Sequence, residues 1–293
     1  MSRITTAGIW PDGMRSDRMA ASIARSDPAG CRVALLGLPD DLGVRMNGGR
    51  VGAAEGPYAF RAALARYGTG LPSAGPLPRV FDAGDVAAGL TMAETHDGVT
   101  RVCRALLELD LLPVGIGGGH DLTYAMVRGL AEITRRPLYG IYFDAHLDVR
   151  EEQGSGMAFR RILEECRLER LHVFGLDPFS NTAQHQAWFE GHGGTVGGFG
   201  FDGEWPDGDI FVSLDLDVLD QAYAPGVSAM NPSGWSPARA ENWARAAGRN
   251  PNVRLFDIME LAPRYDPEGR TARLAARLFL AFLQGVAQRP TTA

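Results

Sequence analysis

Carboxylate and imidazole side chains gather where three apolar segments of strand length come to an end. They are His120, Asp144, His146, Asp148, Asp215 and Asp217. Alternate residues of an extended chain point to the same side, so Asp144, His146 and Asp148 should share one face. Asp215 and Asp217 should share a face for the same reason. Charged side chains are seldom buried without a partner, so a bound cation is the simplest explanation for this group.

The set of donor atoms indicates the metal chemistry. Four carboxylates and two imidazoles would crowd one divalent ion, whereas two ions about 3.5 Å apart could use them all. Oxygen ligands with a minority of imidazoles suit Mn²⁺ but would also accept Co²⁺, Ni²⁺ or Fe²⁺. Each motif alone has another interpretation: Asp-x-His-x-Asp could be a helix cap, and the glycines before His120 could cradle a phosphate. The glycine turn lacks the lysine and hydroxyl of a Walker motif, and the three motifs together favour metal.

The elements that must position these residues alternate along the chain. Apolar runs of strand length cover residues 31–38, 80–86, 112–116, 138–143, 171–176, 210–216 and 253–259, with 80–86 short or at an edge. Segments with helical spacing cover 56–67, 92–109, 121–133, 158–167, 182–190, 237–249 and 271–284. This alternation predicts a three-layer α/β/α fold with a central, mostly parallel sheet, which binds ligands at the carboxyl ends of its strands. Without a linker or repeat, we expect one domain over 1–293, with 1–30 as an N-terminal extension.

Composition excludes several classes of protein. The net charge is −6 and no dense run of lysine and arginine occurs, so we expect no nucleic-acid partner. No apolar run reaches membrane-spanning length, and residues 1–26 lack the apolar core of a secretory signal. Cys31, Cys103 and Cys166 are far apart and odd in number, which indicates no disulfide framework. We therefore expect a cytoplasmic protein with no membrane partner.

At these motifs the chain resembles the arginase/agmatinase/formimidoylglutamase family of ureohydrolases, from about residue 43 to 278. The matching motifs are GGGHD (117–121), DAHLD (144–148), SLDLDVLDQAYAPGVSAMNPSG (213–234), DIMELAP (257–263) and TARLAA (271–276). The resemblance implies an arginase-like α/β fold, two Mn²⁺ ions per subunit and a homo-oligomer.

The resemblance also implies a role for each site residue. One ion would be bound by His120, Asp144, Asp148 and Asp215, and the other by Asp144, His146, Asp215 and Asp217. A bridging hydroxide would attack an amidine-like carbon, and Asp148 would pass a proton to the departing amine. Glu260 would border the reacting end of the substrate and hold its cationic nitrogens. The alternative for Glu260 is a surface salt bridge.

The segment after DAHLD points to the substrate. Arginases and agmatinases usually carry a histidine there, but residues 151–159 contain none. Ser155 and Gly156 instead resemble the Ser-Gly-Thr-Pro-Phe segment of formimidoylglutamases, although methionine and alanine replace the threonine and proline. Arg150 stands where arginases have asparagine and formimidoylglutamases have arginine, and an arginine can bind a carboxylate through two parallel hydrogen bonds.

Two further segments carry candidate substrate contacts. Residues 43–57 are close to the formimidoylglutamase pattern GVxRNxGRxGAxxGP, in which Asn47 and Arg50 would line the substrate and Arg45 could help bind a carboxylate. The alternative is that these arginines bind loop carbonyls. Asn181 lies in a Ser-Asn-Thr turn that resembles a substrate-lining Ala-Asn-Thr, with a helix N-cap as its alternative.

The sequence therefore predicts a metal-dependent hydrolase of linear amidines, which converts N-formimidoyl-L-glutamate to L-glutamate and formamide in histidine degradation. Departures from the pattern at Met46, Met157 and Met230 leave room for an amidinohydrolase that acts on a guanidino acid or an agmatine-like compound. A non-catalytic metal-binding homologue is a third interpretation, but all six ligand positions carry competent residues.

Overall fold

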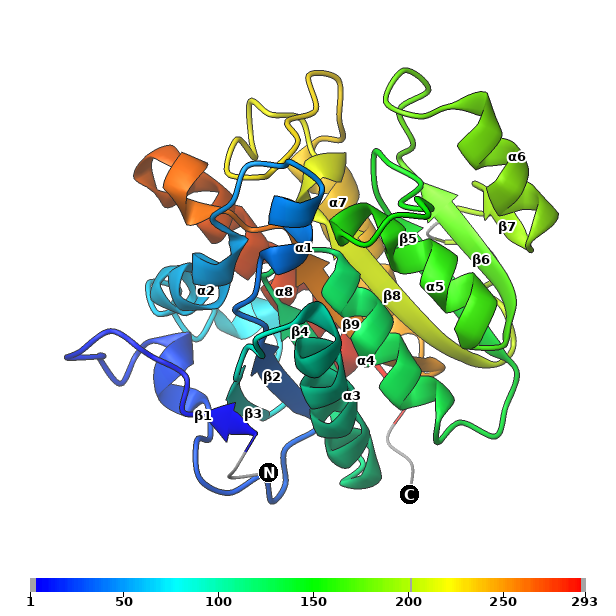
Figure 1. The fold of residues 1–293 in the computed structure, drawn as a ribbon. Helices are drawn as coiled ribbons and strands as arrows, with labels where there is room; N and C mark the ends of the chain where they lie inside the picture. Colours follow the sequence, from blue (N-terminus) through cyan, green and yellow to red (C-terminus); the bar gives the residue numbers. More distant parts are fainter. Residues whose placement is uncertain (1–3, 201, 291–293) are drawn as a thin grey trace.

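Figure 1 shows the computed structural model, which describes residues 4–200 and 202–290. Within these ranges one sheet has the strand order β1-β3-β2-β4-β9-β8-β5-β6-β7. The strands are β1 Thr5–Thr6, β2 Val33–Gly37, β3 Val80–Val86, β4 Leu112–Ile116, β5 Leu138–Phe143, β6 Leu168–Phe174, β7 Gly194–Val196, β8 Asp209–Asp215 and β9 Val253–Met259. Only β1 pairs antiparallel, with β3; the other pairs between these strands are parallel.

Helices cover both faces of the sheet. They are α1 Leu42–Met46, α2 Gly56–Leu64, α3 Met92–Glu108, α4 Asp121–Ala131, α5 Ala158–Glu165, α6 Ala183–Gly191, α7 Pro237–Arg249 and α8 Arg270–Ala287. In Figure 1, α3, α4 and α5 lie in front of the sheet, and α7 and α8 lie behind it. The predicted three-layer arrangement around a mostly parallel sheet is confirmed.

Local sequence explains the central elements. β2, β4 and β8 are buried along their whole length, as strands covered on both faces must be. β2 and β4 are therefore apolar throughout, whereas β8 carries Ser213 and ends in the ligand Asp215. α3 begins with a capping box: the Thr91 hydroxyl accepts from the Glu94 N–H at 3.2 Å, and the Glu94 carboxylate accepts from the Thr91 N–H at 3.3 Å. Its apolar stripe, including Val99 and Leu106, is buried as its spacing predicts.

Elements at the borders of the sheet differ most from the prediction. β3 has the predicted bounds but lies between β1 and β2, so the alternative of an edge strand is wrong. β1, β7 and α1 were not predicted, because segments of two, three and five residues carry too little periodicity to detect. No helix of the described residues is both long and apolar enough to span a bilayer.

A buried ion pair joins α2 to β3, and the N-terminal segment bonds to the same carboxylate. The Arg61 guanidinium on α2 lies 2.8 Å from the Asp82 carboxylate and 2.6 Å from that of Asp85, both on β3. Trp10 donates its indole N–H to Asp82 at 2.6 Å. Because Arg61 is buried, its charge depends on both carboxylates for compensation.

Candidate metal centre

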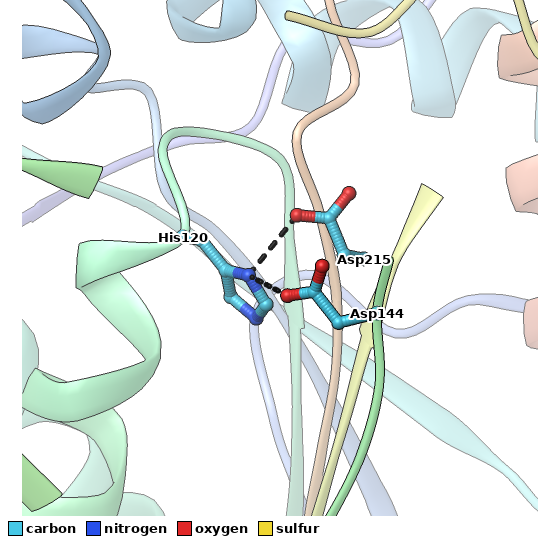
Figure 2. Close-up of side chains that lie close together, drawn as sticks. All are labelled: His120, Asp144 and Asp215. Carbon is cyan, nitrogen blue, oxygen red and sulfur yellow. Dashed lines mark ion pairs between the residues drawn. The ribbon is translucent and has the colours of Figure 1, made fainter. Parts of the chain in front are cut away.

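The six predicted ligands lie together at the carboxyl ends of β4, β5 and β8. Figure 2 shows His120, Asp144 and Asp215 pointing toward one another. The ligand atoms of these three residues lie within 4.8 Å of one another, as do those of Asp144, His146 and Asp217. Asp144 belongs to both groups. Each group of ligand atoms is compact enough to surround one cation, and the two groups share the Asp144 carboxylate, so together they fit a two-ion centre.

His120 carries a buried nitrogen that has no hydrogen-bond partner among the described residues. Its Nδ1 lies 3.1 Å from Asp144 Oδ2, 3.2 Å from Asp148 Oδ2 and 3.0 Å from Asp215 Oδ2. Despite this proximity, His120 Nδ1 and Asp144 Oδ2 are buried without a hydrogen bond among the described residues. Buried polar atoms without partners are costly, and a cation between the nitrogen and the oxygens would remove that cost.

The other ring nitrogen of His120, Nε2, is held by a hydrogen bond with Ser213 on β8. His120 Nε2 lies 2.9 Å from the Ser213 hydroxyl, which donates its own proton to Asp257 at 2.5 Å. The Ser213 oxygen must therefore accept from His120, which assigns the ring proton to Nε2. This tautomer leaves the Nδ1 lone pair directed at the carboxylates, as a metal ligand requires.

His146 completes the second group from a more open position. Its Nδ1 lies 3.0 Å from Asp217 Oδ2 and 3.3 Å from Asp144 Oδ1, and its side chain is 28% exposed, against 1% for His120. The predicted extended backbone is wrong here: β5 ends at Phe143, and the His146 N–H folds back to donate to Asp144 Oδ1 at 2.6 Å.

The other two ligands also leave the extended conformation. Asp148 has a φ of +48°, and Asp217 lies in a 3₁₀ turn, Leu216–Val218. The Asp217 N–H donates to Asp215 Oδ1 at 2.7 Å. The ligands therefore converge because tight turns direct them inward, and not because alternate residues share a strand face.

The pKa values show how strongly these charges oppose one another. Burial, with Asp217 and Asp148 close by, raises the pKa of Asp144 to about 6. Burial and Asp217 also raise the pKa of Asp215 well above its ordinary value. Burial alone would lower the pKa of His120, but the facing carboxylates outweigh it and raise that pKa. Divalent cations would relieve the repulsion between the carboxylates.

Glu260 faces the same centre from the end of β9. It is buried, its Oε1 accepts from the His120 N–H at 2.9 Å, and its Oε2 has no partner among the described residues. Burial raises its pKa to about 8. The alternative of a surface salt bridge for Glu260 is therefore wrong. Glu260 also has a left-handed φ of +65°. Such strained backbone conformations cluster at functional sites.

Four of the predicted substrate contacts lie together. The Asn47 side-chain amide donates to the Ser155 hydroxyl at 3.1 Å, and the backbone N–H of Arg150 donates to the Gly156 carbonyl at 2.9 Å. A Cβ on Gly156 would lie 2.9 Å from Asn47 Nδ2 and 3.1 Å from Arg150 Cδ, so a larger residue would shift these two side chains. The exposed Arg150 guanidinium has no hydrogen bond or ion pair with any described residue.

The side chains of Arg50 and Asn181 form hydrogen bonds with backbone atoms. Arg50 donates through Nε to the Ser228 carbonyl at 3.1 Å and through Nη2 to the Val227 carbonyl at 2.5 Å, and it stacks on Tyr265. This favours the alternative that it holds loop carbonyls. Asn181 bonds the backbone of the ligand loop, and the N-cap of α6 is Thr182, so the N-cap alternative for Asn181 is wrong.

Sequence reasoning missed the residues that support the ligands. Ser213 and Asp257 were not singled out, nor was Thr123, which donates to Asp257 at 3.0 Å. The available signal was an aspartate in the middle of the apolar run of β9, because a buried carboxylate needs a partner.

The chain is similar to known proteins in both sequence and fold. The Arginase family model matches residues 31–196 and 202–284. A formimidoylglutamase of Aromatoleum aromaticum is 38% identical over 96% of this chain and 90% of its own, and one of Ralstonia nicotianae is 33% identical over 94% and 91%. A Trypanosoma cruzi formiminoglutamase solved with Mn²⁺ has a TM-score of 0.82 at 28% identity, covering 93% of this chain and 99% of its own. Proclavaminate amidino hydrolase from Streptomyces clavuligerus has a TM-score of 0.80 at 27% identity, covering 92% and 96%.

Proposed function

This chain belongs to the arginase family, and we propose that it hydrolyses N-formimidoyl-L-glutamate to L-glutamate and formamide, a step of histidine degradation. One observation indicates a substrate with a carboxylate: the unpaired Arg150 guanidinium lies beside Gly156 and follows the ligand Asp148 by two residues. An unpaired, exposed arginine suits a carboxylate, and this substrate has two. Relatives named formimidoylglutamase, similar over most of the chain, support the proposal.

We propose that the centre holds two Mn²⁺ ions. His120, Asp144, Asp148 and Asp215 would bind one ion, and Asp144, His146, Asp215 and Asp217 the other. The two groups that share Asp144 support this number, and a relative solved with Mn²⁺ supports the metal. Such cations lower the pKa of a coordinated water and so supply a nucleophile at neutral pH.

The residues around the centre would divide the remaining work. Arg150 would bind a substrate carboxylate and Glu260 the cationic amidine nitrogen, which together orient the amidine carbon. Water adds to that carbon and its proton passes to Asp148. The bond from carbon to the glutamate nitrogen then breaks, and the nitrogen leaves with the proton that Asp148 returns. The products are L-glutamate and formamide, so all atoms of substrate and water are accounted for.

A second candidate is hydrolysis of a guanidino acid. The likeness to proclavaminate amidino hydrolase favours it, because that enzyme shares the fold at a similar level of identity. Arg150 would serve any substrate with a carboxylate, so the two candidates differ only at the reacting end. We also propose that the chain acts as a single domain, in a homo-oligomer, in the cytoplasm.

A substrate panel separates these candidates. Mn²⁺-loaded protein is assayed on N-formimidoyl-L-glutamate, arginine, agmatine and 4-guanidinobutyrate. We expect the highest kcat/KM with formimidoylglutamate. A higher kcat/KM with any guanidino compound would reject the proposed substrate while leaving the metal centre in place.

A further inference from the structure

Asn181 uses its whole side-chain amide to hold the loop that carries His146. Its Oδ1 accepts from the Leu147 N–H at 2.9 Å, and its Nδ2 donates to the Ala145 carbonyl at 2.8 Å. These two backbone groups lie on either side of His146. The same Nδ2 also donates to the Asp177 carbonyl at 2.8 Å, within the connection between β6 and α6, so Asn181 joins that connection to the ligand loop.

This clamp matters because the two histidines are held in different ways. His120 is fixed through its ring, since Nε2 bonds Ser213 and Ser213 bonds Asp257. The corresponding Nε2 of His146 has no hydrogen-bond partner in residues 4–200 and 202–290. Apart from the Nδ1 contacts with Asp144 and Asp217, the direction of the His146 ring therefore depends on its backbone. Asn181 holds that backbone on both sides, and the Asp177 N–H adds one bond to the Ala145 carbonyl at 3.0 Å.

We propose that Asn181 is a positioning residue that retains the metal ion on the side of His146 and Asp217. The inference rests on the proposed function only in assuming a second ion, and it assigns Asn181 a role other than lining the substrate. All three of its bonds end on backbone atoms, so none of these bonds is available to a substrate. Loss of the clamp should release the His146 loop while the His120 side keeps its own support.

Metal binding to the variant Asn181→Ala tests the proposal. Metal-free protein is titrated with Mn²⁺ followed by electron paramagnetic resonance, and the occupancy of each position is read from anomalous scattering in crystals. Loss of an outer partner of a metal ligand typically weakens affinity about 10–100-fold. We expect that loss at the His146 position, an unchanged His120 position, and disappearance of the spin-coupled signal at limiting Mn²⁺. Excess Mn²⁺ should restore kcat, with KM unchanged.

Thr182→Ala is the matched control. The Thr182 hydroxyl accepts from the His185 N–H at 3.1 Å and caps α6, so its loss destabilises the same segment without touching the clamp. We expect this variant to keep both ions. Asn181→Asp, which keeps the shape and the acceptor but loses both donors, covers the case in which the alanine variant does not fold.

Two results would overturn the inference. One is wild-type Mn²⁺ affinity at both positions in folded Asn181→Ala and Asn181→Asp. The other is a raised KM with both ions bound, which would place Asn181 against the substrate. Neither result depends on which substrate is preferred, because the metal titration is done without substrate.

Discussion

Replacement of Arg150 by alanine should separate substrate binding from chemistry. The guanidinium is exposed and has no protein partner among the described residues, so its removal leaves no buried group unpaired. A hydrogen bond to a charged group contributes about 1.5–3 kcal/mol, and solvent screening places an exposed pair in the lower part of that range. Since each 1.4 kcal/mol is about tenfold in affinity, KM should rise roughly 10- to 50-fold.

The assay compares Arg150→Ala and Arg150→Lys with wild type on formimidoylglutamate and on agmatine, which has no carboxylate. We expect kcat within about threefold of wild type on formimidoylglutamate, because the proposed contact is remote from the reacting carbon. Lysine should recover part of the loss, since it keeps the charge but not the paired donors. Any activity on agmatine should be unaffected.

Arg160→Ala is the control for loss of a nearby positive charge. Arg160 already pairs with Glu151 at 2.9 Å and Glu164 at 3.1 Å, so it has no need of a substrate partner. Its removal should leave KM unchanged. Equal damage by Arg150→Ala to substrates with and without a carboxylate would refute the reasoning and make Arg150 a structural residue.

Metal removal and substitutions at Gly156 and Arg61 test other parts of the structure. Chelation of the metal should lower Tm by roughly 9 °C, because each of the two ions at 100 times its Kd contributes about 2.7 kcal/mol, and added Mn²⁺ should restore it; an unchanged Tm would argue against bound ions. Gly156→Ala should raise KM and spare metal content, since its Cβ would press on Asn47 and Arg150; an unchanged KM would mean that Arg150 can shift freely. Arg61→Ala should lower the free energy of unfolding in urea by about 3–5 kcal/mol, because it strands the buried Asp82, and a loss below about 1 kcal/mol would contradict that dependence.

Much of the fold follows from local sequence. β5, α7 and β9 have the predicted bounds, because apolar runs limit the two strands and the Ser236 cap with Pro237 begins the helix. The prediction was less accurate at ends without such signals: α8 extends to Ala287 instead of residue 284. Tertiary packing decides where such an end lies, and no local pattern records it.

The metal ligands were predictable for a different reason. His120, Asp144 and Asp215 each follow an apolar strand, and the carboxyl ends of parallel strands meet at one edge. The path of the backbone between ligands was not predictable by alternation, since the turn after Phe143 depends on a hydrogen bond from the His146 N–H.

Arg50 shows why substrate contacts are harder to predict than ligands. Its type suits a carboxylate, and its place in a motif suggested one, yet its donors go to the carbonyls of Val227 and Ser228 on a loop some 177 residues away. Residue type defines what a side chain can bind, whereas the partner depends on how distant loops pack. Asn181 was likewise expected to line the substrate, and its side-chain amide bonds backbone atoms.

The central claim is that this chain cleaves the bond between the formimidoyl carbon and the glutamate nitrogen in a metal-dependent reaction. The most direct measurement follows ¹³C-labelled N-formimidoyl-L-glutamate by NMR with Mn²⁺-loaded and with metal-free protein. We predict equal amounts of formamide and L-glutamate with the loaded protein, and neither product without metal. Turnover to N-formyl-glutamate and ammonia, or no turnover by fully loaded protein, would contradict the account.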